Sequence, residues 1–219
     1  AVPGTLCRIE VSRDLRTWRR LEDKGRLAPD PRWYDDGTSG RWDGIDVLPR
    51  PGGGYVGYLT ARPWNGSDDP EYVSVGKLES EDGLHWRAVA PPRMEWGEMP
   101  ASNLYEVGGV EMVGGAYRMM ICQVASERRL GRRTAWSPGL GDAGMYGFRS
   151  ASLDGPFEPD GSSYRLLTSP SWIPGGLPYS GMSHFTRFYR CDGDVLVNHH
   201  SIEFCGDGSN VWFAPLKRT

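Results

Sequence analysis

The sequence has little cysteine, no long apolar run and no marked excess of charge. Its 219 residues contain four cysteines, and none of these has close Cys-x-x-Cys spacing. This pattern favours idle or buried thiols over a zinc site or a disulfide framework, although Cys191 and Cys205 could pair if the protein is exported.

No apolar run approaches the ~20 residues that a membrane helix needs. The formal net charge of -3 argues against nucleic acid and against an anionic membrane as the main partner.

Two further signals are missing. No basic and apolar leader opens these residues, so the sequence leaves a secreted and a cytoplasmic location equally open. No long amphipathic helix is visible either, because the best candidate, residues 126–133, is short and rich in arginine. In contrast, 30 glycines, 17 prolines, 9 tryptophans and 10 tyrosines are typical of many short strands joined by tight turns. We therefore expect an all-β fold.

A strand that ends in a Ser-x-Asp turn recurs along the chain. The first copy spans residues 6–18 and the second spans residues 73–86, while a degraded third copy and a remnant occupy residues 145–157 and 210–216. The copies follow one another about every 60 to 70 residues, which indicates a repeat architecture.

A hairpin of two strands lies between successive copies of this turn. The hairpins span residues 42–59, 104–120 and 183–200. In the second, Gly114-Gly115 between two apolar runs signals a tight turn. Glycines 108 and 109, next to Glu106, have no Cβ and would let a backbone or a ligand approach closely.

The repeat of an inner hairpin and an outer strand is typical of the blades of a β-propeller. A β-sandwich is the alternative, but it would not require the same strand order at a fixed period. We predict one propeller domain over residues 1–219, with four-stranded antiparallel blades. The four visible blades occupy residues 1–30 (a remainder of the first), 40–90, 103–160 and 180–219.

The repeated turns resemble those of the five-bladed propellers of glycoside hydrolase families 43 and 32. Residues 12–18 match the Ser-x-Asp-Leu-x-x-Trp turn of these families in full, and residues 80–86 match it with Gly83 inserted. The resemblance extends over nearly the whole chain, with degenerate motifs. It implies a protein that hydrolyses the glycosidic bond of a furanoside or a related glycan, with a carbohydrate as its partner.

The resemblance also implies roles for individual acids. Glu106 stands where the third blade of family 43 carries its general acid, although Val107-Gly108 replaces the usual Gly-Pro. Asp46 falls on the aspartate of the Trp-Ala-Pro-Asp-Val strand, with one extra residue, and would orient that acid. Asp43 competes for this role. Asp43 is expected to share the face of Asp46 only if the strand is regular, and Gly44 suggests a bulge.

We expect Trp42, His184, Arg187 and His199 to contact the substrate. Three of the four histidines lie in the hairpin of residues 183–200, where His184 is the first choice. No cofactor is required and no protein-bound catalytic metal is expected, although a structural or cavity cation such as calcium is compatible with the site.

The first-blade aspartate that serves as catalytic base in these families would lie before Ala1, and no fifth blade is visible. We therefore expect the first strand and the last blade to come from elsewhere in the same protein or from another chain. The alternative is a smaller protein with a diverged site. A carbohydrate-binding propeller without catalysis is then the second hypothesis for function.

Overall fold

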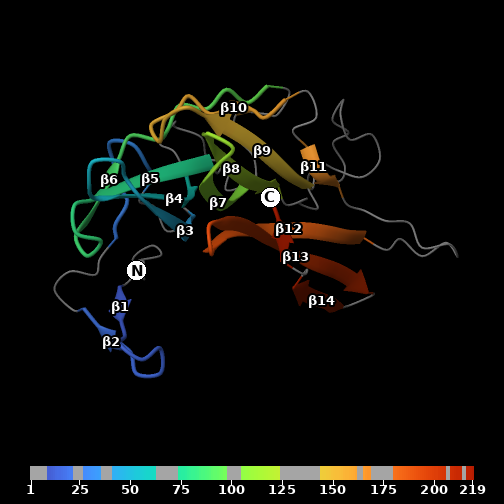
Figure 1. The fold of residues 1–219 in the computed structure, drawn as a ribbon, viewed down its shortest axis with the longest axis horizontal. Helices are drawn as coiled ribbons and strands as arrows, with labels where there is room; N and C mark the ends of the chain where they lie inside the picture. Colours follow the sequence, from blue (N-terminus) through green and yellow to red (C-terminus); the bar gives the residue numbers. More distant parts are fainter. Residues whose placement is uncertain are drawn as a thin grey trace, which may run out of the picture. The chain divides into compact units, whose positions relative to one another are not determined.

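The structure is a computed structural model. It describes residues 9–21, 27–35, 41–62, 74–97, 105–123, 144–161, 165–168, 180–205, 208–213 and 216–219. The chain divides into two compact units, Ala1–Pro92 and Arg93–Thr219, and each is described by itself. The boundary lies between the ranges predicted for the second and third blades. Every regular element in the described ranges is a β-strand, which confirms the all-β class (Figure 1).

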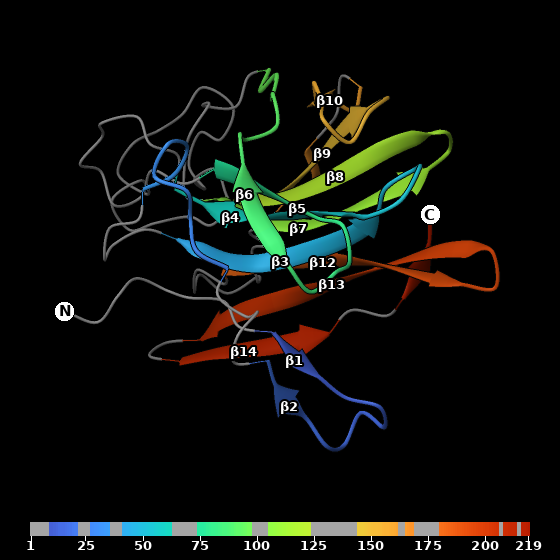
Figure 2. The same ribbon diagram turned by 90° about the vertical axis from the view of Figure 1, so that its left-hand side faces the viewer.

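The first unit holds a short ribbon and a four-stranded antiparallel sheet. The ribbon pairs β1 (Glu10–Val11) with β2 (Arg19–Arg20). The sheet contains β3 (Trp42–Pro49), β4 (Tyr55–Ala61), β5 (Ser74–Ser80) and β6 (Trp86–Val89) in chain order. Figure 2 follows this order from blue β3 to green β6. The predicted hairpin of residues 42–59 is therefore β3 and β4, at one edge of a meander.

An apolar core and two hydrogen bonds of Tyr34 hold this sheet to the preceding loop. The buried cluster contains Leu27, Tyr34, Trp42, Leu59, Ala61 and Leu78. The hydroxyl of Tyr34 donates to the carbonyl oxygen of Val89 at 2.7 Å and accepts the amide of Lys77 at 2.9 Å. Burial raises the pKa of Tyr34, so this hydroxyl stays protonated and bridges β5 and β6 at any ordinary pH.

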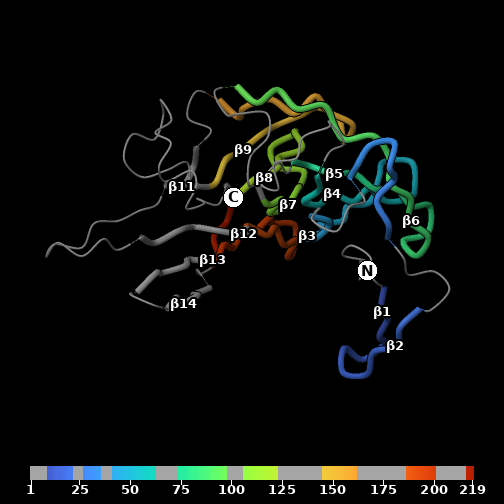
Figure 3. Tube along the Cα trace, turned by 180° about the vertical axis from the view of Figure 1, so that it is seen from behind, coloured from blue at the N-terminus to red at the C-terminus, as the bar shows by residue number. Residues whose placement is uncertain are grey.

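The second unit holds two sheets. The first contains β7 (Tyr105–Val113), β8 (Ala116–Gln123), β9 (Gly144–Ser150) and β10 (Glu158–Pro159) in order, with β11 (Arg165–Thr168) also paired to β9. The second contains β12 (Ser180–Cys191), β13 (Asp194–Cys205) and β14 (Gly208–Phe213) in order, with β15 (Lys217–Arg218) also paired to β13. β12 packs against β7, β8 and β9, as Figure 3 traces from behind.

The predicted turn at Gly114-Gly115 is confirmed. It joins β7 to β8, and its two residues have φ angles of 58° and 82°. Two successive positive φ angles match the right-handed twist of a tight hairpin, and glycine adopts them without steric strain.

The repeated Ser-x-Asp turn has the same hydrogen bonds in both complete copies. Asp14 Oδ1 accepts the amides of Arg16 and Thr17 at 2.8 and 2.7 Å. Asp82 Oδ1 accepts the amides of Leu84 and His85, both at 2.8 Å. The second copy joins β5 to β6, so the strand before the turn is the third of its sheet and a fourth follows. This agrees with the predicted order of an inner hairpin followed by an outer strand that ends in the turn.

Cys191 does not pair with Cys205, the alternative that the sequence left open beside idle thiols. Cys191 is the last residue of β12 and lies opposite Asp194, where β13 begins, whereas Cys205 ends β13. The two cysteines therefore stand at opposite ends of one hairpin, and Cys191 has a free, exposed thiol. Cys122 is buried and forms no disulfide. No helix in the described residues is long and apolar enough to cross a membrane.

Candidate functional site

The first strand of each large sheet carries a β-bulge, and the predicted site residues lie next to these bulges. In β3 the register shifts between Asp43 and Asp46. In β7 it shifts between Val107 and Gly109, just after Glu106, and in β12 it shifts between His184 and Arg187. A bulge turns side chains out of the regular alternation of a strand and is common beside active sites.

The bulge in β3 places Asp43 and Asp46 on one face of the sheet. Asp43 lies opposite Thr60 and Asp46 lies opposite Tyr58. Residues that face each other across an antiparallel pair share a face, and Thr60 and Tyr58 are two residues apart on β4. The acids are three positions apart, so a regular strand would have put them on opposite faces, and the prediction that only a regular strand lets them share a face is wrong.

The two acids of β3 have different surroundings. The carboxylate of Asp43 forms a bidentate ion pair with Arg41, at 2.6 Å from Nε and 2.8 Å from Nη2. Asp46 is partly buried and also takes part in a polar or electrostatic interaction. The bulge predicted from Gly44 is confirmed, and the choice between Asp43 and Asp46 as supporting carboxylate stays a prediction.

Glu106 lies at the edge of a sulfur-rich apolar cluster in the second unit. It is partly buried and sits directly opposite Cys122, so it shares a face of the sheet with Cys122 and Met120. Cys122 is 0% exposed and packs with Met120, Met145 and Phe188. The side chain of Glu106 therefore leaves the strand on the face that carries this apolar cluster. An environment with little water suits a proton donor.

A close backbone contact joins the bulges of β7 and β12. A Cβ placed on Gly108 would lie 2.9 Å from the carbonyl oxygen of Thr186 and 3.0 Å from its amide nitrogen. Thr186 is 0% exposed, and its hydroxyl donates to the Met145 sulfur at 2.7 Å. The expectation that Gly108 permits a close approach is confirmed, with a backbone as the partner.

This contact brings Glu106 and Arg187 to one junction. Glu106 lies two residues before Gly108, and Arg187 follows Thr186 directly. One guanidinium nitrogen of Arg187, Nη1, is buried and has no hydrogen-bond acceptor among the described residues, while the residue takes part in another interaction. Thr186 is the residue that sequence reasoning missed, since nothing in its local pattern distinguishes it from its neighbours.

The two histidines predicted to bind substrate lie on neighbouring strands. The backbone of His184 pairs with that of His200, and its side chain lies outside the described residues. His199 is 8% exposed, and its Nδ1 lies 3.2 Å from the carbonyl oxygen of His200. Its Nε2 lies 3.4 Å from Nζ of Lys217. Both ring nitrogens of His199 therefore have polar partners within the second unit.

Trp42 has a packing role in the first unit. It is 2% exposed, its indole nitrogen donates to the carbonyl oxygen of Leu27 at 2.7 Å, and its ring meets that of Tyr34 edge to face. The ring of Trp42 thus packs in the core of the first unit, and its indole nitrogen has a hydrogen-bond partner there. Substrate contact by Trp42, His184, Arg187 and His199 stays a prediction.

The described residues contain no group of three or more His, Cys, Asp and Glu side chains placed to hold a metal ion. The predicted catalytic acids lie in different units, with Asp43 and Asp46 in the first and Glu106 in the second. That no cofactor is required and that a cavity cation is compatible with the site both stay predictions from the sequence.

The fold is that of the β-propeller glycoside hydrolases. A variant of levansucrase from Bacillus subtilis matches with a TM-score of 0.59 and 14% identity, over 97% of this chain and 58% of that chain. An α-L-arabinanase from Cellvibrio cellulosa, solved with arabinohexaose, matches with a TM-score of 0.55 and 14% identity, over 94% and 63%. A family 117 glycoside hydrolase from Zobellia galactanivorans matches with a TM-score of 0.52 and 16% identity, over 98% and 61%.

All three are five-bladed propeller hydrolases, as the repeated turns predicted. The chain spans 58% to 63% of the length of these proteins. At such low identities the likeness establishes the fold and leaves the roles of single residues to be argued from the site. No protein-family model matches the sequence, and no curated protein matches it.

Proposed function

We propose that this chain forms part of a glycosidase that acts on a furanoside or a related glycan, with Glu106 as general acid and Asp46 as supporting carboxylate. The observation that carries the proposal is the bulge beside the predicted site residues in the first strand of all three large sheets. This feature occurs in a fold whose solved neighbours are glycoside hydrolases.

Hydrolysis of a glycosidic bond needs a carboxylic acid that protonates the leaving oxygen and a carboxylate that acts on water or on the anomeric carbon. Glu106 suits the first role because it borders the apolar cluster of Met120, Cys122 and Met145, which supports a neutral carboxyl group. Arg187 directly follows Thr186, whose backbone contacts Gly108 in the β7 bulge. The guanidinium of Arg187 would bind a substrate oxygen.

We place Asp46 in the supporting role because it falls on the aspartate of the Trp-Ala-Pro-Asp-Val motif, with one extra residue. The Asp43 carboxylate already has both oxygens bound to Arg41, at 2.6 and 2.8 Å. A carboxylate in a bidentate ion pair has little freedom to orient a second acid, so we assign Asp43 to the local structure of β3.

The test is turnover by a Glu106→Gln variant on a panel of aryl furanosides and aryl pyranosides. We expect loss of turnover with an unchanged unfolding midpoint, because glutamine keeps the shape of the side chain and cannot donate a carboxyl proton. Glu111→Gln, on the same strand, is the matched control and should retain turnover. Undiminished activity of Glu106→Gln would remove Glu106 from the mechanism.

The same panel separates catalysis from binding. If the unaltered protein hydrolyses none of the substrates, isothermal titration with arabinohexaose and with levan oligosaccharides decides the matter. Binding without hydrolysis would replace the enzyme by a carbohydrate-binding propeller, the second function predicted from the sequence.

A further inference from the structure

A hollow of about 760 Å³ lies in the first unit, where β3 turns into β4 and β5 turns into β6. Gly52, Gly53 and Gly54 form one wall, and both turns contribute charged and aromatic side chains. A Cβ at Gly52 or Gly53 would have no atom within 4 Å, so this wall is open. The volume lies within the range of about 300 to 1,000 Å³ that is common for small-molecule sites.

Two aromatic rings line the hollow in fixed positions. Tyr55 is 37% exposed, and its ring centroid lies 6.5 Å from that of Trp86, with the planes tilted by 49°. Trp86 Nε1 donates to the carbonyl oxygen of Gly83 at 2.9 Å, which fixes the indole. Gly83 also packs against Tyr55, since a Cβ there would lie 3.4 Å from the ring. Such a pair offers apolar surface at a low cost in conformational entropy.

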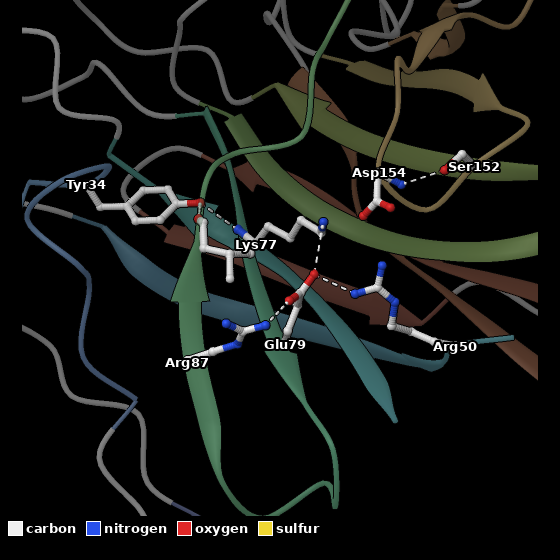
Figure 4. A network of polar contacts seen from close by, with 8 residues as sticks. Tyr34, Arg50, Lys77, Glu79, Arg87, Ser152 and Asp154 are labelled. Atoms are coloured by element: carbon white, nitrogen blue, oxygen red, sulfur yellow. Dashed lines mark hydrogen bonds and ion pairs between the residues drawn. The ribbon is translucent and has the colours of Figure 1, made fainter. Parts of the chain in front are cut away.

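The polar groups of the hollow are also held in place. Arg50 and Arg87 donate to opposite oxygens of Glu79 at 2.5 and 2.8 Å (Figure 4). Lys77 Nζ lies 3.4 Å from the same carboxylate. Burial alone would raise the pKa of Glu79, but the hydrogen bond from Arg50 and the charges of Lys77 and Arg50 outweigh it and lower the pKa. The carboxylate therefore stays ionised, and the largely exposed guanidinium of Arg87 presents further N–H donors to a ligand.

The charge of the lining selects the class of ligand. Glu79, Glu81 and Asp82 carry negative charge and face two arginines, Arg50 and Arg87, and His85. His85 Nδ1 also lies 2.6 Å from Asp82. An anion such as phosphate would meet three acids, and a cation would meet two arginines. Aromatic faces beside balanced, fixed hydrogen-bonding groups suit a neutral molecule with many hydroxyl groups and apolar C–H faces.

We propose that this hollow is a second carbohydrate site, which binds a neutral oligosaccharide between Tyr55, Trp86 and the Arg50–Glu79–Arg87 cluster. None of the predicted catalytic or substrate-binding residues lines it. The proposal does not depend on hydrolysis at Glu106, so a bound glycan at this site would anchor the protein to a polymer whether or not the protein cleaves it.

Fluorine NMR of protein labelled with fluorotryptophan tests the site. The resonance of Trp86 is identified as the one that disappears in Trp86→Phe, and the labelled protein is titrated with arabinohexaose, xylohexaose and levan oligosaccharides. We expect a saturable shift of this resonance with at least one probe, with a Kd on the order of 1 mM. The shift should persist in Glu106→Gln, which separates this test from that of catalysis.

Matched variants localise the effect. Tyr55→Ala should abolish the shift, while Tyr189→Ala, which removes another exposed tyrosine outside the hollow, should preserve it. If Tyr55→Ala loses its folded circular-dichroism spectrum, Arg87→Met takes its place, since Arg87 is largely exposed. The absence of a shift with all three probes would overturn the proposal. An equal shift with inorganic phosphate would also overturn it, because the site would then bind anions.

Discussion

Gly108 on β7 and Thr186 on β12 touch through their backbones, at the bulges of the two strands. A Cβ at residue 108 would lie 2.9 Å from the Thr186 carbonyl oxygen and 3.1 Å from that of Met120. The two first strands of the second unit therefore meet where each departs from regular pairing. Glu106 and Arg187 both lie within two residues of this contact. The geometry of the contact therefore sets the positions of both residues.

Gly108→Ala should distort this junction. The added methyl group meets backbone atoms, which cannot rotate away, so we expect a loss of about 1–3 kcal/mol in the free energy of unfolding, as for overpacked cores. Under the proposed function, turnover should fall as well, because Glu106 moves with the strand. Urea unfolding and turnover on the aryl glycoside panel measure the two effects.

Gly115→Ala is the comparison for this substitution. A methyl group added at position 115 would have no atom within 4 Å, but the φ angle there is 82°, so alanine costs only the strain of the left-handed region. It should destabilise the protein without changing turnover of the folded fraction. Equal losses of turnover in both variants would show that the junction does not position Glu106.

The sequence predicts this part of the fold well because glycine and turn chemistry act locally. Gly114-Gly115 can be assigned to a tight turn, and Gly108 to a close approach, from the residues themselves. The identity of the approaching residue, Thr186, depends on packing between sheets about eighty residues apart in the chain, which no local pattern encodes. Trp42 shows the same limit of local patterns. An aromatic residue at the start of a strand suits a sugar-binding site and an apolar core equally. Only the structure shows that the ring of Trp42 packs against Tyr34.

Asp46→Asn and Asp43→Asn should separate the two acids of β3. If Asp46 supports the general acid, its replacement should lower turnover by about 100-fold and shift the pH profile of the reaction, because the charge felt by Glu106 changes. Asp43→Asn should mainly loosen Arg41, with little effect on turnover. The reverse order would assign the catalytic role to Asp43.

Asp14 should titrate well below an ordinary carboxyl group. Its hydrogen bonds from the Thr17 and Arg16 amides and from the Ser12 hydroxyl lower its pKa to about 2 from 3.8. Since the folded form has the lower pKa, the turn's contribution to stability is complete above pH 3.8 and is lost as the pH falls toward 2. A carbon-detected NMR titration of the Asp14 carboxyl group measures the midpoint.

Ser12→Ala is the control for this titration. It should raise the midpoint only in part, because the amides of Thr17 and Arg16 still donate to Asp14. A midpoint that stays near 3.8 in the unaltered protein would contradict the hydrogen bonds of the turn.

Arg190 and Glu111 should stabilise the packing of β12 against β7. Arg190 donates to both oxygens of Glu111, from Nη2 at 2.6 Å and from Nε at 3.0 Å, and the Glu111 side chain is only 15% exposed. A double-mutant cycle with Arg190→Met and Glu111→Gln should give a coupling of about 1 kcal/mol, the upper end for ion pairs near the surface. High salt should reduce this coupling, since Arg190 is 57% exposed.

The Arg149–Glu158 pair, with both side chains about half exposed, is the matched cycle and should give a smaller coupling. Equal couplings would show that the bidentate geometry of Arg190 adds nothing to the stability of the unit.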